Sequence, residues 1–499
     1  MKYVMGVDLG TSGVKVILVD ETGKVCGESS QPFQLIQEKP GYCEQHPDDW
    51  VKQTVAAMRE LVETYPVPAK HVEGISFSGQ MHGLVLLDES RQVLRRAILW
   101  NDTRTTAQCH DITNKLGKRL QEITKNDALE GFTLPKLLWV KEHEPHIDQN
   151  IDVFLLPKDY VRFRLTGLLH TDYSDAAGTL LFDIEKQSWS EELCRQFDIP
   201  PHICPPIVSS EAEVGTLLPQ VAREIGIPAK VKVFAGGADN ACGAVGAGIL
   251  SSGQTLCSIG TSGVILSYEA QRDRALQGHL HLFQHAKKDA FYTMGVTLSA
   301  GYSLDWAKSV LAPHESFQTF LQGAEHVPPG ADGLLFTPYL VGERTPYADS
   351  TIRGSFVGLD SRHERVHLVR SVLEGITFSL NESIALFRQA GKRIDSIVSI
   401  GGGAKSDTWL QMQADIFQAE IIQLEHEQGP ALGAAMLAAV GCGWFESLED
   451  CAMRFIHPVG AYSPNEQHVD RYADLFRLYQ SIYAKTKDIH ADLSRFREK

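Results

Sequence analysis

The tetrapeptide Gly-Thr-Ser-Gly occurs twice in the chain, each time between two apolar runs. The first copy lies in "GVDLGTSGVKVILVD" at residues 6–20, and the second lies in "CSIGTSGVILSYE" at residues 257–269. One copy alone indicates no more than a hairpin turn, because glycine, serine and threonine are common in turns. Two copies in the same setting, one in each half of the chain, predict an internal duplication with two related strand–turn–strand units.

The length of the chain fits such a duplication. A chain of 499 residues exceeds what one hydrophobic core usually organises, so two domains are expected. We place the boundary between residues 245 and 246, which leaves one copy of the turn in each domain.

Local patterns predict several elements. The opening meander comprises strands at Tyr3–Leu9, Val14–Asp20 and Val25–Glu28, with a tight turn at "ETGK". A helix is expected near residues 48–64, and "GISFSGQMHGLVLLD" predicts a hairpin around the loop Gly79–Gly83. In the second half, "SIVSIGGGAKSDTWLQMQADIF" predicts a strand, a glycine turn and a helix. The C-terminal helix carries an apolar stripe, which we interpret as packing, formed by Tyr472, Leu475, Phe476, Tyr479 and Ile482.

The charge balance disfavours two classes of partner. The chain has 62 acidic and 47 basic residues and a formal net charge of -15, so we expect no binding to nucleic acid or to a membrane surface.

Nine cysteines are scattered singly without a C-x-x-C pair, which predicts free thiols in a reducing cytoplasm. No apolar run reaches the ~18 residues of a membrane span, and the N-terminus enters a strand at once, unlike a signal peptide. The oligomeric state is left open, with a homodimer as one option.

The two turns fit the binding of a nucleoside triphosphate. Such a ligand requires backbone N–H donors, small residues that allow close approach, and a metal that neutralises charge. Gly10–Gly13 and Gly260–Gly263 offer the first two, and Asp8, just ahead of the first turn, is placed to hold Mg²⁺ directly or through water. The sequence contains no G-x-x-x-x-G-K-[ST], no G-x-G-x-x-G opening a dinucleotide-binding unit and no protein-kinase motif set. We therefore expect ATP to bind in the two-loop mode of the actin-like fold.

Asp239 is the candidate catalytic base. It lies in "AGGADNACG", at the junction of a strand, a glycine turn and a helix, so its side chain is expected to project from a rigid element into a cleft. Transfer of a phosphoryl group to an alcohol needs a carboxylate within hydrogen-bond reach of the attacking hydroxyl. The alternative is a helix N-cap without chemistry, because a helix N-terminus stabilises a carboxylate.

Three further segments are candidate ligand contacts. "SGQMHG" exposes Met81 and His82, and a polar ring beside a thioether suits a small sugar; a hairpin loop with a solvated histidine is the alternative. "LWNDTR" presents Trp100, Asn101 and Asp102, for which sugar contact and plain strand termination are comparable interpretations. "GGGAKSD" is interpreted as allowing the close approach of adenine, with a generic strand-to-helix turn as the alternative.

Together these motifs resemble those of the FGGY carbohydrate kinases. The resemblance spans about residue 3 to residue 440 and rests on "DLGTSGVK", "SGQMHG", "ILWNDTR", "AGGADNACGAVGAG", "SIGTSGV", "GERTPYAD" and "IGGGAKSD", in this order. It implies an α/β fold with two ribonuclease H-like, or actin-like ATPase, domains flanking a catalytic cleft. It further implies that residues 1–245 bind the sugar and hold the first phosphate turn, while residues 246–499 hold the second turn and bind adenine.

The resemblance also implies the reaction. The "GQMHG" loop is similar to that of family members that act on D-xylulose, whereas members that act on glycerol have an Arg-Glu pair there. The implied activity is the ATP- and Mg²⁺-dependent phosphorylation of D-xylulose to D-xylulose 5-phosphate in xylose catabolism.

Individual residues take roles by the same resemblance. Asp239 is the general base on the sugar hydroxyl, and Asp8 lies at Mg²⁺. The implied sugar contacts are Met81, His82, Asp102 and Asn240. The implied ATP contacts are Thr11, Ser12 and Thr261 near the phosphates, and Gly301, Gly402 and Gly403 near the nucleoside. The sequence departs from the family pattern at Asp407, where the members that act on glycerol have asparagine, so the adenine contact is not carried over to this position.

Three alternatives stay open at the level of sequence. A related kinase would act on L-ribulose, gluconate or another polyol. An actin- or Hsp70-like ATPase would form a filament or act as a chaperone, but only a helix and a short tail follow residue 470, which disfavours a chaperone. A sugar sensor without activity would retain the fold, although the presence of Asp239 and both turns argues against it.

Overall fold

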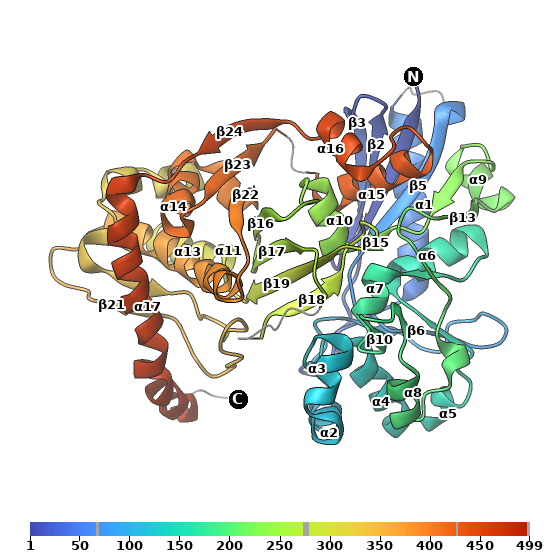
Figure 1. Ribbon diagram of the computed structural model, residues 1–499, viewed down its shortest axis with the longest axis horizontal. Helices are drawn as coiled ribbons and strands as arrows, with labels where there is room; N and C mark the ends of the chain where they lie inside the picture. Colours follow the sequence, from blue (N-terminus) through green and yellow to red (C-terminus); the bar gives the residue numbers. More distant parts are fainter. Residues whose placement is uncertain (66–68, 273–278, 426–427, 497–499) are drawn as a thin grey trace.

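The computed structural model describes residues 1–65, 69–272, 279–425 and 428–496. Two halves lie side by side, and each is built around a seven-stranded mixed sheet (Figure 1). Helices lie on both faces of the first sheet and on the outer side of the second, so the chain is an α/β protein.

The first sheet has the strand order β13-β14-β5-β1-β2-β3, and its seventh strand, β15 (Gly237–Ala238), pairs parallel with the end of β5. Its central strand β1 (Tyr3–Leu9) pairs antiparallel with β2 (Gly13–Asp20) and parallel with β5 (Val72–Gly79). β3 (Val25–Pro32) pairs with β2, so the predicted opening meander is confirmed, with a third strand that continues past Glu28. The predicted helix near residues 48–64 is α1 (Pro47–Thr64), which packs on β2 and β3.

The second sheet repeats this arrangement in the order β18-β19-β17-β16-β22-β23-β24. β16 (Gly253–Ile259) pairs antiparallel with β17 (Gly263–Glu269) and parallel with β22 (Ile394–Gly401), as β1 does with β2 and β5. The strand–turn–strand unit predicted twice from the sequence is therefore present in both halves. The remaining strands of this sheet are β18 (His281–Gln284), β19 (Phe291–Thr297), β23 (Glu420–Leu424) and β24 (Pro458–Tyr462).

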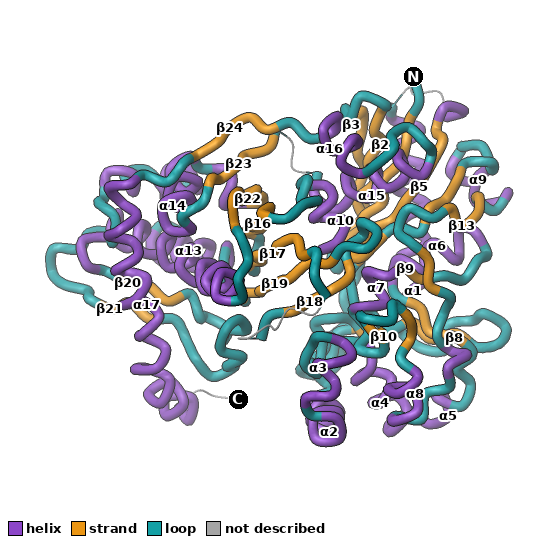
Figure 2. Tube along the Cα trace, viewed as in Figure 1, coloured by secondary structure: helices purple, strands orange, loops and turns teal. Residues whose placement is uncertain are grey.

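Helices cover the second sheet on the side that faces away from the first (Figure 2). They are α13 (Arg365–Gln389), α14 (Asp407–Phe417) and α17 (Glu466–Leu493). The apolar stripe predicted on the C-terminal helix is confirmed as packing: Tyr472 and Tyr479 are buried in the core of this half.

Two helices made largely of small residues join the halves. α10 (Asp239–Gly246) follows the first sheet, and α15 (Gly429–Gly441) comes from the second half but packs on α10, β1 and β5 (Figure 1). A Cβ atom on Gly433 would lie 1.8 Å from the Cys242 carbonyl oxygen, and one on Gly6 would lie 2.0 Å from the Ala431 carbonyl oxygen. Since real side chains do not approach so closely, glycine at these positions is what allows the backbones to touch.

The hairpin predicted around Gly79–Gly83 is wrong. β5 ends at Gly79 within the parallel part of the first sheet, and the following strand β6 (Val85–Leu87) pairs with β8 (Val153–Leu155) in a separate small sheet. A short apolar run is typical both of a hairpin strand and of a buried parallel strand, so the pattern did not show with which strand each run pairs. The consequence is that the segment 80–83 leaves the carboxyl end of a central strand, where ligands usually bind in such sheets.

The other elements connect and cover the two sheets. The shorter strands are β4 (Glu44–Gln45), β7 (Ala97–Ile98), β9 (Thr171–Asp172), β10 (Phe182–Asp183), β11 (Ser188–Trp189), β12 (Ile207–Val208), β13 (Glu213–Thr216), β14 (Lys232–Phe234), β15 (Gly237–Ala238), β20 (Leu335–Thr337) and β21 (Ser355–Val357). The remaining helices are α2 (Thr106–Leu116), α3 (Lys118–Thr124), α4 (Thr133–His143), α5 (Pro145–Asp148), α6 (Pro157–Thr166), α7 (Tyr173–Ala177), α8 (Glu191–Gln196), α9 (Pro219–Ile225), α11 (Gly301–Leu311), α12 (Phe317–Leu321) and α16 (Leu448–Phe455). None of the helices within the described ranges has the length and apolarity to cross a membrane.

Candidate active site

The first glycine turn is held by side chains from two other segments. The Gly10 N–H donates to the Gly13 carbonyl at 3.0 Å, which closes the turn between β1 and β2. The Thr11 hydroxyl accepts a hydrogen bond from Trp100 Nε1 at 2.8 Å and donates one to Gln80 Oε1 at 3.1 Å. The turn is therefore hydrogen-bonded to Gln80, which follows β5, and to Trp100, which follows β7.

The second turn is closed in a similar way and is covered by a helix. The Gly260 N–H donates to the Ser262 carbonyl at 3.0 Å, and the first N–H groups of α11 donate back to the turn, from Gly301 to Gly260 O at 2.8 Å and from Tyr302 to Thr261 O at 3.1 Å. A Cβ atom on Gly301 would lie 2.5 Å from Gly260 O. The helix N-terminus thus lies against the turn, and the positive end of the helix dipole favours an anion nearby.

One pocket of about 230 Å³ contains Asp239 and is reached by the second turn, while among the described residues the first turn contacts it only through Trp100. Trp100, the hydrogen-bond partner of Thr11, lines this pocket, as does Ser262 of the second turn. Each half of the chain contributes further walls. From the first half these are Met81, His82, Leu129, Gly131, Phe132 and Asn240, and from the second half Val264, His281, Phe283, Met294, Val296 and Arg344.

Two partly buried carboxylates, Asp8 and Asp239, lie close enough beside this pocket for their charges to interact. Asp239 is the first residue of α10, not its N-cap, and its Oδ1 accepts hydrogen bonds from the Asn240 N–H at 2.7 Å and from Asn240 Nδ2 at 3.1 Å. Burial and the charge of Asp8 raise the pKa of Asp239 to about 7. Burial raises the pKa of Asp8 to about 6, against the opposing effects of Ser78 and Lys15. A carboxylate with a pKa near neutrality is well matched to general-base catalysis.

The same carboxylates test whether Mg²⁺ fits. Asp8 Oδ1 is buried and has no hydrogen-bond partner among the described residues, and the neighbouring Asp239 adds a second negative charge. Mg²⁺ is usually held by one or two carboxylates together with water and substrate phosphates. The residues present therefore fit the metal.

The raised pKa of Asp239 makes folding stability depend on pH. The unfolded carboxyl loses its proton near pH 4, whereas the folded one loses it near 7, so ionisation favours the unfolded chain. The destabilisation is absent below about pH 4, grows as pH rises and is complete above about pH 7. We expect Asp239→Asn to raise the Tm by a few degrees at about pH 8 and to leave it unchanged at about pH 4, measured by scanning calorimetry without nucleotide. The same gain at both pH values would contradict the assigned burial.

His82 presents one ring nitrogen to the pocket as an acceptor. Its φ of 68° is unusual for a residue other than glycine. Burial, followed by the charge of Lys136, lowers the pKa of His82 to about 3, so the ring is neutral. Its Nδ1 lies 2.5 Å from the Gly178 carbonyl, which accepts only, so Nδ1 carries the proton and Nε2 is left as an acceptor. An acceptor in this position suits a sugar hydroxyl.

Lys136, which the sequence interpretation missed, holds the loop that carries His82. Its Nζ is fully buried and donates to the His82 carbonyl at 2.9 Å and to the Gly131 carbonyl at 2.6 Å. Burial lowers the pKa of Lys136 to about 7. Two walls of the pocket are thereby tied to α4. In the segment "GFTLPKLLWV" this lysine is a charged residue among apolar ones. A lysine in such an apolar helix could have indicated a buried ammonium group with a structural role.

The structure does not bring Asp102 to the pocket. Its carboxylate is fully buried, accepts from the Arg104 guanidinium at 2.7 and 2.9 Å and from the Cys43 N–H at 2.6 Å, and lines no part of the pocket. A direct sugar contact would require this ion pair to open, so the assignment stays a prediction. Asn240, in contrast, lines the pocket, and its Nδ2 contacts Met81 Sδ at 3.6 Å.

A larger pocket of about 1090 Å³ begins at the second turn. Thr261, Gly301 and Gly402 line it together with apolar side chains such as Phe317 and Trp409, which suits a nucleoside. Gly403 is buried just behind, where a Cβ atom would lie 2.4 Å from Ile259 Cδ1. Of the four residues predicted near ATP in the second half, Thr261, Gly301 and Gly402 line this pocket, and Gly403 lies directly behind its wall.

Neither the predicted phosphate contact Ser12 nor Asp407, to which no adenine contact was carried over, lines either pocket. Ser12 is exposed on the first turn, and its carbonyl accepts from the Phe33 N–H at 2.8 Å. Asp407 begins α14 and accepts from the Tyr462 hydroxyl at 2.8 Å, and it does not line the larger pocket.

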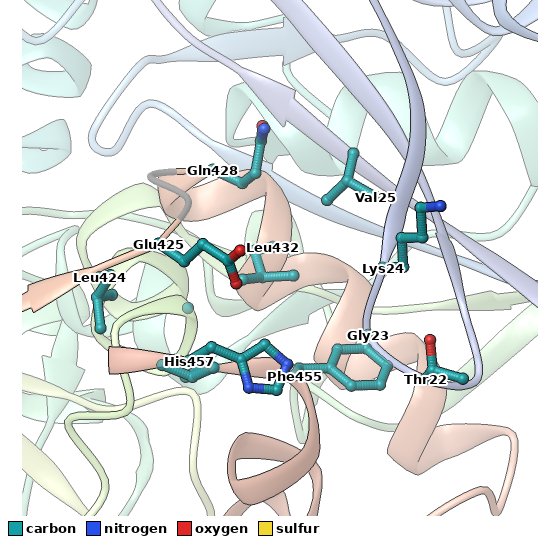
Figure 3. A pocket seen from close by; sticks show the side chains of 12 residues that line it. Thr22, Gly23, Lys24, Val25, Leu424, Glu425, Gln428, Leu432, Phe455 and His457 are labelled. Carbon is teal, nitrogen blue, oxygen red and sulfur yellow. The ribbon is translucent and has the colours of Figure 1, made fainter. Parts of the chain in front are cut away.

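A third pocket of about 300 Å³ lies at the other end of α10 (Figure 3). Its lining includes Lys24 on the turn between β2 and β3, Glu425 after β23, and His457 after α16. It shares no lining residue with the two pockets described above.

The chain matches known carbohydrate kinases over its whole length. The FGGY family of carbohydrate kinases, N-terminal domain, matches residues 3–246, and the C-terminal domain matches residues 255–442; the boundary at 245/246 stays a prediction. A xylulose kinase of Bacillus subtilis is 64% identical over 100% of both chains.

Solved structures of the same kind share the fold. A ligand-bound xylulose kinase from Lactobacillus acidophilus is 29% identical with a TM-score of 0.93, covering 99% of this chain and 100% of its own. A gluconate kinase from the same organism is also 29% identical, with a TM-score of 0.92 and the same coverage. The expected pair of ribonuclease H-like domains is therefore confirmed, and ATP is the substrate that such kinases share. This chain belongs to the FGGY family of carbohydrate kinases.

Proposed function

We propose that the protein is a xylulose kinase, which transfers the γ-phosphoryl group of ATP to D-xylulose. The observation that carries this proposal is the position of Asp239 in one pocket with Met81, His82 and Ser262 of the second glycine turn. The relatives named as xylulose kinases, at identities up to 64%, support the choice of sugar.

Asp239 acts as the general base in this proposal. It accepts the proton of the C5 hydroxyl while that oxygen attacks the γ-phosphorus in line. The bond from phosphorus to the bridging oxygen breaks, ADP leaves, and D-xylulose 5-phosphate forms. The two hydrogen bonds from Asn240 to Oδ1 fix the carboxylate, so that Oδ2 is free to face the sugar.

The remaining predicted residues bind the nucleotide and its metal. Asp8 would hold Mg²⁺ directly or through water, and the metal would supply positive charge near the phosphates of ATP. The phosphates lie at the turns, where the candidate contacts are Thr11, Ser12 and Thr261, and the nucleoside lies in the larger pocket, where they are Gly301, Gly402 and Gly403. The pocket walls exclude water, which otherwise competes with the sugar as acceptor.

A panel of sugars in a coupled ADP assay tests the substrate. We expect kcat/KM to be highest for D-xylulose, and lower for L-ribulose, D-gluconate, glycerol and other polyols, because Met81 and His82 match a ketopentose in size and hydrogen bonding. A higher kcat/KM for L-ribulose or gluconate would replace the proposed substrate while leaving the kinase family intact. ADP formation that responds to no sugar would reject the proposal altogether.

The proposal extends to location and assembly. All nine cysteines are free thiols, which fits a reducing cytoplasm. We propose a homodimer, supported by the exposed apolar side chains Ile489, Leu493 and Phe496 at the end of the C-terminal helix. Sedimentation equilibrium of the full chain distinguishes a dimer from a monomer.

A further inference from the structure

The short helix α7 contacts the backbone just ahead of the candidate base. α7 packs on β15, the strand that leads into Asp239 (Figure 1). The Ala238 N–H donates to Ser174 Oγ at 2.9 Å, and Ala238 is the N-cap of α10. Both residues are fully buried, so this hydrogen bond is shielded from water. The Ser174 hydroxyl thus fixes the backbone one residue before Asp239.

Asp172 determines which way the Ser174 hydroxyl points. Its Oδ2 accepts from the Ser174 hydroxyl at 2.5 Å and from the Ser174 N–H at 2.9 Å, and Lys158 Nζ lies 2.8 Å from its Oδ1. Burial tends to raise the pKa of Asp172, but the charge of Lys158 and the hydrogen bonds of Ser174 lower it below its usual range. An ionised carboxylate only accepts, so the hydroxyl proton points to Asp172 and the Ser174 oxygen is left to accept from Ala238.

Buried charges on α6 support this arrangement. Lys158 and Arg162 lie on α6 and are fully buried. Lys158 also pairs with Asp175 of α7 at 2.9 Å. Arg162 Nη1 donates to the Ala235 carbonyl at 2.6 Å, in the link between β14 and β15. The chain that leads to α10 is therefore held at two points, at Ala235 and at Ala238.

The other end of α7 contacts the wall of the sugar pocket. Gly178 follows the helix, and its carbonyl accepts the hydrogen bond from His82 Nδ1. A Cβ atom on Gly178 would lie 2.9 Å from that nitrogen and 3.0 Å from Met81 Cε, so the two segments are closely packed. One short helix therefore contacts the backbone ahead of the base at one end and the sugar-binding histidine at the other.

We propose that Ser174 is a positioning residue for the reaction: its hydroxyl, oriented by Asp172, sets where Asp239 lies relative to the sugar. The inference rests on the proposed kinase function and adds a residue that lines neither the sugar pocket nor the larger pocket. A base must lie within hydrogen-bond reach of the hydroxyl that it deprotonates, and a displacement of about 1 Å costs up to about 100-fold in rate. Loss of the Ser174 hydroxyl should therefore lower kcat without weakening sugar binding.

Steady-state kinetics of Ser174→Ala test the inference. We expect kcat with D-xylulose to fall about 10- to 100-fold, because the buried Ala238 N–H loses its acceptor and the start of α10 shifts. The KM for D-xylulose and the ADP affinity should stay within about twofold of the wild-type values, since His82 keeps its contact with Gly178. Ser174→Cys keeps the size of the side chain but supplies a weaker acceptor, so an intermediate kcat is expected.

Ser210→Ala is the matched control. The Ser210 hydroxyl is also buried and donates to the same Asp172 Oδ2 at 2.9 Å, and within the described ranges it makes no other hydrogen bond. Each substitution removes one hydrogen bond to Asp172, so the Tm should fall in both variants, whereas kcat in Ser210→Ala should stay within about twofold of the wild type. Hydrogen exchange of a peptide that spans residues 235–242 should be faster in Ser174→Ala than in Ser210→Ala.

Equal kcat values in Ser174→Ala and Ser210→Ala would overturn the inference, because the role of Ser174 would then be structural. A rise in KM at constant kcat would also overturn it, since the hydroxyl would then serve sugar binding. If Ser174→Ala does not fold, a wild-type kcat in Ser174→Cys has the same consequence. A wild-type enzyme whose ADP formation responds to no sugar would reject the proposed function, and this inference with it.

Discussion

Asp239→Asn will lower kcat by about 10²- to 10⁴-fold, because the amide cannot accept the proton of the attacking hydroxyl. The substitution keeps the shape of the side chain and its place at the start of α10. Nucleotide affinity should stay close to that of the wild type, since Asp239 lines the sugar pocket and not the larger pocket that suits the nucleoside. The coupled ADP assay gives kcat, and calorimetric titration with ADP gives the affinity.

Asp49→Asn is the matched control for this variant. Asp49 is also an acid in the first turn of a helix, but it is exposed on α1 and lines neither the sugar pocket nor the larger pocket. Its replacement should leave kcat and ADP affinity unchanged. If the kcat of Asp239→Asn equalled that of the wild type, another group would remove the proton. The assignment of Asp239 as the general base would then be wrong.

Gly433→Ala will destabilise the protein by more than about 2 kcal/mol, although alanine favours helix over glycine by about 1 kcal/mol. The new Cβ atom would lie 1.8 Å from the Cys242 carbonyl oxygen, so α15 must move away from α10. Because α10 begins with Asp239, activity should fall as well. Urea denaturation measures the free energy of unfolding, and the ADP assay measures activity.

Gly243→Ala offers a control in the same helix pair. Gly243 lies within α10, but its added Cβ would meet nothing closer than Pro430 Cγ at 3.7 Å, which is an ordinary contact. We expect this variant to gain up to about 1 kcal/mol from helix propensity. If Gly433→Ala were stabilising to the same degree, the close backbone approach of the two helices would be disproved.

Much of the fold follows from local patterns. The opening strands were located to within a few residues because β-branched runs and the "ETGK" turn agree there, and α10 was expected from a strand and a glycine turn. Pairing was harder to predict, as the segment 80–83 shows: the two apolar runs on either side belong to different sheets. Short apolar runs specify burial, not the neighbouring strand.

Some residues of the candidate site could also be predicted from local patterns, and others could not. The position of Asp239 was predictable because strand, turn and helix fix where the side chain points. The position of Asp102 could not be predicted. Its partner Arg104 is two residues away, and the sequence does not show whether Asp102 contacts Arg104 or a sugar. His281, Phe283 and Arg344 were missed because they lie far along the chain from the first-half wall that they face. Only folding brings such groups together, although the alternation of histidine and phenylalanine in "HLHLFQH" hints at a polar strand face.

The placement of α15 on β1 and β5 bears on how the protein is made. The first sheet leaves the ribosome long before residues 429–441 are translated. The face of β1 and β5 on which α15 packs therefore stays exposed in the nascent chain until α15 is made. Truncated or stalled products that stop before α15 would expose that face and aggregate. The two halves of this enzyme therefore cannot fold independently in succession, because the first half needs α15 from the second half to complete its packing.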